Sequence, residues 1–159
     1  MPMSSGTFRD MDRRELVKRI RRELKNEKAI LEILDKYNLD PSIIDHVSIK
    51  FEPLDVSAKT VDGHVILNER LLDGDWRDIV RYATHELTHV AQQTTSDIEK
   101  TQDLDYLDDP YEKEAFRTQR KVMEELYDPE EIQSYLEGLV DHHGLKGKER
   151  LRKIRELKR

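Results

Sequence analysis

Hydrophobic residues recur at helical spacing along the first part of the chain. The apolar positions follow one another at intervals of three, four or seven residues, at Leu16, Ile20, Leu24, Leu31 and Leu34. Such intervals place the side chains on one face of a helix. The pattern therefore predicts helix over residues 11–37, either as one long helix or as two helices joined near Asn26. Residues 1–10 show no such pattern, and we expect them to be disordered.

The period changes to that of β-strands in the middle of the chain. The segment "HVSIKF" (46–51) alternates between apolar and polar residues, and "SAKTVDGHVILN" (57–68) contains the pattern of two short strands. Asp62-Gly63 lies between these two strands and is a favoured hairpin turn, because both residue types tolerate a positive φ. These residues predict a small antiparallel sheet of two or three strands.

Helical spacing returns after residue 75. Each predicted helix follows an aspartate that can cap its first turn, at Asp75, Asp109 and Asp128. Glu131 also completes a capping-box pattern with Asp128. The predicted helices cover residues 76–93, 110–127 and 129–144. Residues 146–159 are expected to form a basic helix or tail with little apolar surface to bury.

These elements predict an α+β fold in a single domain over residues 11–145. The domain is expected to be mostly helical, with the small sheet packed on the helix 76–93 and with further helices at the C-terminal end. Charged residues make up 39% of the 159 residues and hydrophobic residues 36%, so the expected core is modest. The chain contains no cysteine, which excludes disulfides, thiolate metal ligands and cysteine nucleophiles.

The sequence also bears on where the protein works and what it contacts. No apolar run approaches the roughly 20 residues of a membrane span, and the first residues lack the apolar stretch of a secretory signal. A cytoplasmic protein without membrane contact is therefore expected. Both ends of the chain are basic, but no aromatic residues are interleaved with the basic ones, so nucleic-acid binding is not expected.

The segment "RYATHELTHVAQQ" (81–93) carries the strongest chemical signal. It contains the motif His85-Glu86-x-x-His89 in a chain that has six histidines. Histidines four residues apart lie one turn apart on the same helix face, where both imidazoles can bind one zinc ion. The glutamate between them can take a proton from a bound water. The apolar residues of the helix form a different stripe, so the alternative is a solvated pair of surface histidines.

A third protein ligand must come from elsewhere in the chain. The residues after His89 lack the glycine and third histidine of a HExxHxxGxxH motif, which leaves a glutamate from a second helix. Glu112 extends the inward-facing stripe of the helix 110–127, whereas Glu114 is predicted to face away from it. A buried carboxylate needs a partner, and zinc would provide one. We therefore predict Glu112 as the ligand and Glu114 as the second choice; Glu112 could alternatively close a capping box with Asp109.

These segments resemble the gluzincin metallopeptidases, and most closely their minimal soluble members, the minigluzincins. The resemblance covers about half of the chain, residues 46–127, and implies a zincin-like fold with a glutamate-bearing second helix. It also implies that Glu112, three residues before Ala115, is the zinc ligand. The matching segments are "VILNERLL" (65–72), "HELTHVAQQ" (85–93) and "PYEKEAF" (110–116).

The sequence departs from the gluzincin pattern at Phe116. Many gluzincins have an acidic residue or asparagine four residues after the ligand glutamate, where it orients a ligand histidine. Because this chain has phenylalanine there, the supporting hydrogen bonds are expected from Asp108, Asp109 or Glu114.

The predicted activity is zinc-dependent hydrolysis of peptide bonds in a peptide or protein substrate. His85, His89 and Glu112 would hold Zn²⁺, and Glu86 would act as the general base on a water activated by the metal. The resemblance also implies that an edge strand at 64–68 holds the substrate by strand addition. The alternative is a latent or inactive zinc-binding scaffold that acts in protein–protein interaction. Candidates for a donor to the transition state are Tyr106, Tyr111, His142 and His143.

Overall fold

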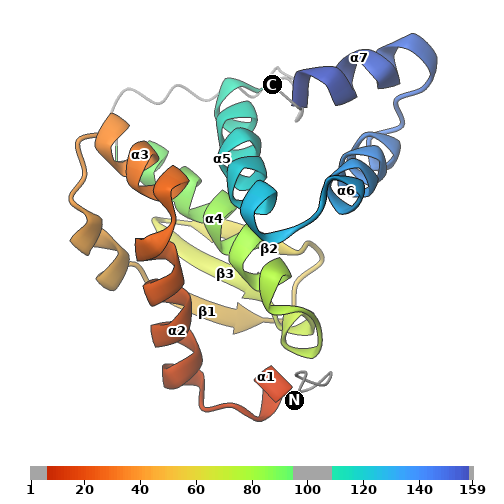
Figure 1. The fold of residues 1–159 in the computed structure, drawn as a ribbon. Coiled ribbons are helices and arrows are strands. Elements are labelled where there is room, and N and C mark those ends of the chain that lie inside the picture. Colours follow the sequence, from red (N-terminus) through yellow and green to blue (C-terminus); the bar gives the residue numbers. More distant parts are fainter. Residues whose placement is uncertain (1–6, 95–108, 158–159) are drawn as a thin grey trace.

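The computed structural model describes residues 7–94 and 109–157, which form the predicted α+β fold of helices around one small sheet (Figure 1). In chain order the elements are α1 (Thr7–Asp10), α2 (Arg13–Asn26), α3 (Lys28–Lys36), η1 (Pro41–Asp45), β1 (Ile49–Glu52), β2 (Ala58–Val61), β3 (His64–Asn68), η2 (Glu69–Asp73), α4 (Trp76–Gln93), α5 (Pro110–Leu126), α6 (Pro129–His142) and α7 (Gly147–Leu157). Here η denotes a 3₁₀-helix. The predicted starts after Asp75, Asp109 and Asp128 are confirmed, and Asp128 and Glu131 form the predicted capping box.

The N-terminal part contains two helices rather than one. α2 ends at Asn26 and α3 begins at Lys28, because Glu27 between them is extended (φ −87°, ψ 116°). The prediction of disorder over residues 1–10 is wrong for residues 7–10, which form α1. Phe8 in α1 is 2% exposed and packs on Trp76 with ring centroids 5.9 Å apart. A single buried aromatic residue has no period, so the pattern could not reveal it.

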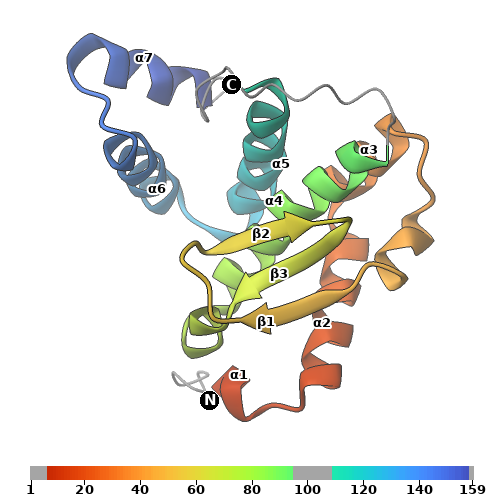
Figure 2. The same ribbon diagram turned by 180° about the vertical axis from the view of Figure 1, so that it is seen from behind.

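The sheet is mixed, and this corrects the prediction of an antiparallel sheet. Its order is β1-β3-β2, with β1 parallel and β2 antiparallel to β3 (Figure 2). The predicted hairpin turn is confirmed, with φ of 48° at Asp62 and 78° at Gly63. Residues 53–57 carry the chain past β3, so that β3 lies in the centre, where Val65 and Leu67 are buried. The segment 64–68 is therefore not an edge strand; among the described residues, the edge strand of the hairpin is β2.

Helix α4 is the central helix of the fold. It contacts β2 and β3 on one side and α2, α3 and α5 on the others, so it is buried almost all round. The prediction that its histidine face lies outside the core is wrong for His85, which is 4% exposed. The apolar stripe of α4 joins the main core as predicted, through Ile79, Ala83, Leu87, Val90 and Ala91.

Helices α6 and α7 form an arm that extends from α5 (Figure 1). A second apolar cluster, separate from the main core, holds this arm, and its buried members are Phe116, Leu136, Val140, Ile154 and Leu157. The prediction that 146–159 buries little is therefore wrong within the described residues, because Ile154 and Leu157 of α7 are 6% and 5% exposed. In the parts of the chain that the structure describes, no helix is both long and apolar enough to cross a bilayer.

Candidate metal centre

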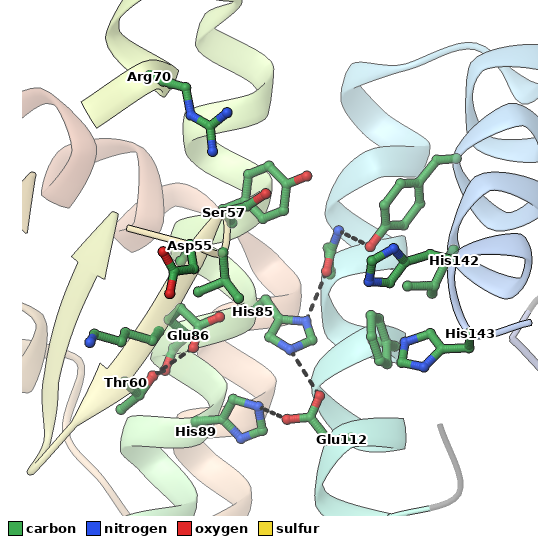
Figure 3. Close-up of a pocket in the computed structure, with 18 of the residues that line it drawn as sticks. Asp55, Ser57, Thr60, Arg70, His85, Glu86, His89, Glu112, His142 and His143 are labelled. Carbon is green, nitrogen blue, oxygen red and sulfur yellow. Dashed lines mark hydrogen bonds and ion pairs between the residues drawn. The ribbon is translucent and has the colours of Figure 1, made fainter. Parts of the chain in front are cut away.

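Helices α4 and α5 bring the three predicted metal ligands together (Figure 3). Nε2 of His89 lies 2.5 Å from Oε1 of Glu112, and Nε2 of His85 lies 3.4 Å from Oε2 of the same carboxylate. Each residue offers one ligand atom, and the three atoms lie within 4.8 Å of one another. Among the described residues this is the one cluster of three or more such side chains with metal-binding geometry.

The geometry of these atoms fits a divalent cation with tetrahedral coordination. Zinc bound at about 2.0–2.2 Å separates neighbouring ligand atoms by roughly 3.3–3.5 Å. The pair formed by His85 and Glu112, at 3.4 Å, already has this separation, and the pair formed by His89 and Glu112 would widen by about 0.8 Å. Oε2 of Glu112 is also buried without an adequate hydrogen bond from the described residues. A cation would satisfy this atom.

The electrostatics of the three residues favour a bound positive charge. Burial alone would raise the pKa of Glu112, but its contacts with His85 and His89 outweigh burial and hold the pKa well below the usual range. Burial would lower the pKa of His89, whereas the Glu112 carboxylate raises it to about 8. The carboxylate is therefore ionised at neutral pH and stabilises positive charge at the position where a metal would be bound.

His85 is oriented by Gln119, which lies seven residues after Glu112 on the same face of α5. Nδ1 of His85 lies 2.8 Å from Oε1 of Gln119. The amide nitrogen of Gln119 donates to the hydroxyl of Tyr135 at 2.9 Å, which fixes the amide with its oxygen towards the histidine. Nδ1 of His85 is then the donor in this contact, which leaves Nε2 as the ring atom that faces Glu112 and could bind a metal.

His89 has a corresponding partner in Gln92. Nδ1 of His89 lies 2.7 Å from Oε1 of Gln92, one turn further along α4. Both histidines thus present Nε2 towards the shared carboxylate. The sequence prediction missed both glutamines as supports. Their spacing could have indicated them, because Gln92 lies three residues after His89 on the same face of α4, and Gln119 lies seven residues after Glu112 on the same face of α5.

Of the predicted supporting residues, Glu114 contacts Gln92, the partner of His89, whereas Asp109 has another role. Asp109 caps α5 by accepting from the backbone N–H groups of Tyr111 and Glu112, and Asp108 lies outside the described residues. The carboxylate of Glu112 contacts the histidines, and the capping-box alternative is not observed for α5. The prediction that Glu114 faces away is wrong, since it is 7% exposed and bonded to Gln92.

Glu86, the predicted general base, lies beside the histidines on the cleft side of α4. It is 7% exposed, and its Oε1 accepts a hydrogen bond of 2.9 Å from the hydroxyl of Thr60 in β2. Thr60 also approaches the backbone carbonyl of Glu86 at 3.0 Å. The edge strand therefore fixes the carboxylate next to the metal-binding face of the helix.

The three ligand residues line an open cleft of about 840 Å³. Figure 3 shows β2 and the preceding loop on one side of the cleft, and His142 at the end of α6 with the following His143 on the other. Tyr135 and Tyr82 also line the cleft, and the sequence prediction missed both. Tyr135 lies seven residues before His142, which places both on one face of α6. Of the predicted tyrosines, Tyr111 is not part of the lining and Tyr106 lies outside the described residues.

Comparison of the chain with known protein families, with curated proteins and with solved structures gives no match. A fold class alone does not identify an activity, so the chemistry of the site is what indicates the function.

Proposed function

We propose that the protein is a zinc-dependent peptide hydrolase of the gluzincin type. The observation that supports this most directly is the convergence of His85 and His89 of α4 with Glu112 of α5 at the side of an open cleft. Two imidazoles and one carboxylate are the ligand set of a catalytic zinc site, because they leave a coordination position open. A structural zinc site would have a fourth protein ligand, and the described residues offer none.

The residues around this centre would have different roles in hydrolysis. Zinc bound by the three ligands would lower the pKa of a water to about 7 and polarise the carbonyl of the scissile bond. Glu86 is the base that would accept the proton of the attacking water and deliver it to the leaving amine. Its hydrogen bond to Thr60 keeps the carboxylate on the cleft side of α4.

Tyr135 is the best-supported donor to the negative charge that develops on the carbonyl oxygen. Its hydroxyl accepts from Gln119, the partner of His85, so it lies close to the centre and keeps its own proton free to donate. Burial raises the pKa of Tyr135 to about 12, so the hydroxyl stays protonated at neutral pH. Such a donor accelerates the reaction because it stabilises a charge that develops only in the transition state.

The substrate would bind in extended form along the free edge of β2. In the register of the hairpin, Lys59 exchanges its backbone hydrogen bonds with Ile66, so the N–H and C=O groups of Ala58 and Thr60 point to the outer edge. This edge borders the cleft, whose lining includes residues 55–60. A peptide could pair with it as an additional strand. The prediction of strand addition is thus transferred from 64–68 to β2.

The proposal is tested by incubating the zinc-loaded protein with a mixture of unstructured peptides and identifying products by mass spectrometry. The wild type should produce internal cleavage products, and Glu86→Gln should bind zinc equally but lose activity by about 10²–10⁴-fold. Glu52→Gln, a substitution of an exposed glutamate on β1, is the matched control and should retain activity.

The alternative, an inactive zinc-binding scaffold, gives a different result in the same experiment. It predicts zinc binding by the wild type and by Glu86→Gln, with no peptide products from either protein. Cleavage that Glu86→Gln leaves unchanged would instead attribute the activity to a contaminant, and it would contradict the proposed role of Glu86.

A further inference from the structure

Glu114 is a buried carboxylate that accepts hydrogen bonds from three side chains, two at the end of α3 and one in α4. Its Oε1 accepts from the hydroxyl of Tyr37 at 2.5 Å and from Nε2 of Gln92 at 2.9 Å. Its Oε2 pairs with the ammonium group of Lys36. Tyr37 and Lys36 lie at the end of α3, far from Glu114 in sequence.

The amide of Gln92 is oriented by these contacts. Its nitrogen donates to the Glu114 carboxylate and to the backbone carbonyl of Tyr111, both at 2.9 Å. A flipped amide would place its oxygen against two other oxygens, so the observed orientation is strongly preferred. The amide oxygen therefore points to Nδ1 of His89, at 2.7 Å, and accepts its proton.

We propose that Glu114 is a positioning residue for the metal centre, acting through Gln92 on His89, and that α3 belongs to this support. The inference rests on the metal site proposed above. By accepting from the Gln92 nitrogen, Glu114 keeps the Gln92 oxygen towards Nδ1 of His89, which leaves Nε2 as the ring atom that can bind a metal. Without the carboxylate, the amide could flip and stabilise the tautomer whose Nε2 carries the proton.

We call the contacts that run from Lys36 and Tyr37 through Glu114 and Gln92 to His89 the relay. It gives α3 a role in the metal centre that the HExxH motif alone does not require. Lys36 and Tyr37 together neutralise and fix the carboxylate, and both come from the segment before the sheet. His85 does not depend on the relay, because its partner Gln119 is held by Tyr135. A loss of the relay should therefore weaken the metal site without abolishing it.

The test is the zinc dissociation constant, measured by competition with a chromophoric chelator. Removal of a supporting hydrogen bond typically lowers metal affinity by 10–100-fold, so Glu114→Gln is expected to weaken binding by about tenfold and Tyr37→Phe by about threefold. Glu32→Gln is the matched control, because Glu32 also pairs α3 with α5, through Lys121 at 3.5 Å, but at the exposed surface. It should leave the dissociation constant unchanged.

A double-mutant cycle separates positioning from a general structural effect. If Glu114 acts through Gln92, then Glu114→Gln should have no further effect on zinc affinity in a Gln92→Leu background. A purely structural role of Glu114 would weaken binding in both backgrounds. The visible absorption bands of the Co²⁺-substituted protein give a second readout, and they should shift in Glu114→Gln and stay unchanged in Glu32→Gln.

The possible results distinguish this inference from the proposed function. Equal zinc affinity in the wild type, Glu114→Gln and Tyr37→Phe would overturn the relay and leave the zinc site intact. A persistent effect in the Gln92→Leu background would also overturn it. Absence of zinc binding by the wild type would overturn the site itself and the proposed hydrolase with it. Tyr37→Phe preserves the packed ring, so it tests the relay even where Glu114→Gln impairs folding.

Discussion

The candidate metal centre and the walls of the cleft differ in how firmly their side chains are held. Along α4 and α5, the residues proposed to bind the metal are largely buried, and each histidine has a partner whose orientation is itself fixed. On the two walls that face each other across the cleft, the side chains are exposed, with Val56 and Lys59 on the β2 side and His142 and His143 on the α6 side. The hydrogen bonds of this region therefore hold the groups that would bind a metal rather than the side chains that would contact a substrate.

The physical requirements of the two regions explain this difference. Metal ligands must be held within a few tenths of an ångström, which needs buried and hydrogen-bonded supports. A strand edge binds a peptide through backbone groups, whose positions are fixed by the sheet and not by exposed side chains. Side chains on that wall can therefore remain mobile and still serve recognition.

The largest effect is expected at Tyr135, which lines the cleft and contacts Gln119 beside the candidate metal centre. Tyr135→Phe removes the proposed donor to the transition state and should lower kcat by about 10²-fold. KM should change little, whereas zinc affinity should also fall, because the hydroxyl holds the Gln119 amide that supports His85; kcat is therefore measured at saturating zinc. Tyr82→Phe, at another tyrosine that lines the cleft, is the control. Equal effects of the two substitutions on kcat would argue against a specific role of Tyr135.

The next effect concerns the firmly held metal centre. Gln119→Leu removes the acceptor for Nδ1 of His85 and should weaken zinc binding by about 10–100-fold. Gln119→Glu keeps an acceptor at this position and should restore most of the affinity. Isothermal calorimetry with zinc would measure both variants. Loss of affinity in Gln119→Glu equal to that in Gln119→Leu would contradict the argument about the tautomer.

A smaller effect is expected on the exposed wall, at the edge of β2. Ala58→Pro removes a backbone N–H that points away from β3, and proline is tolerated at the edge of a sheet. It should raise KM for a peptide substrate by about tenfold, because one hydrogen bond of strand addition is lost. Zinc affinity should not change. Ala58→Ser retains the N–H group, and a similar rise of KM in that variant would attribute the effect to the side chain.

The smallest effect is expected away from the cleft, at Glu27. This residue is 4% exposed; burial and then the neighbouring Glu125 raise its pKa to about 8. Between pH 4.5 and about 8, Glu27 therefore keeps its proton in the folded protein but loses it in the unfolded chain. The free energy of unfolding should fall as the pH rises from 4.5 towards 8. Denaturant unfolding should show that Glu27→Gln reduces this dependence and stabilises the protein at pH 8 by about 1 kcal/mol. An unchanged pH dependence would contradict the assignment.

Local patterns in the sequence predicted α4 and α5 well. The cap at Asp75 and the spacing of the HExxH motif defined α4, and the stripe of α5 selected Glu112 over Glu114 as the group facing the histidines. These features depend on residues within one or two helical turns. Neighbouring residues in the sequence therefore indicate these features without knowledge of the tertiary contacts.

Features that depend on distant contacts could not be predicted in the same way. The alternation of 46–51 and 57–68 indicates strands but not their order, so the central position of β3 remained hidden. Glu114 was predicted to face solvent because α5 was treated as having one buried face. In the structure α3 covers a second face, and the partners Lys36 and Glu114 are 78 residues apart.

The most direct test of the central claim is the zinc content of the purified protein, measured by mass spectrometry for the wild type and for Glu112→Ala. The account predicts one zinc per chain in the wild type and none in Glu112→Ala, because the carboxylate supplies the third ligand and the negative charge of the site. Zinc retained by Glu112→Ala, or no zinc in the wild type after incubation with Zn²⁺, would contradict it.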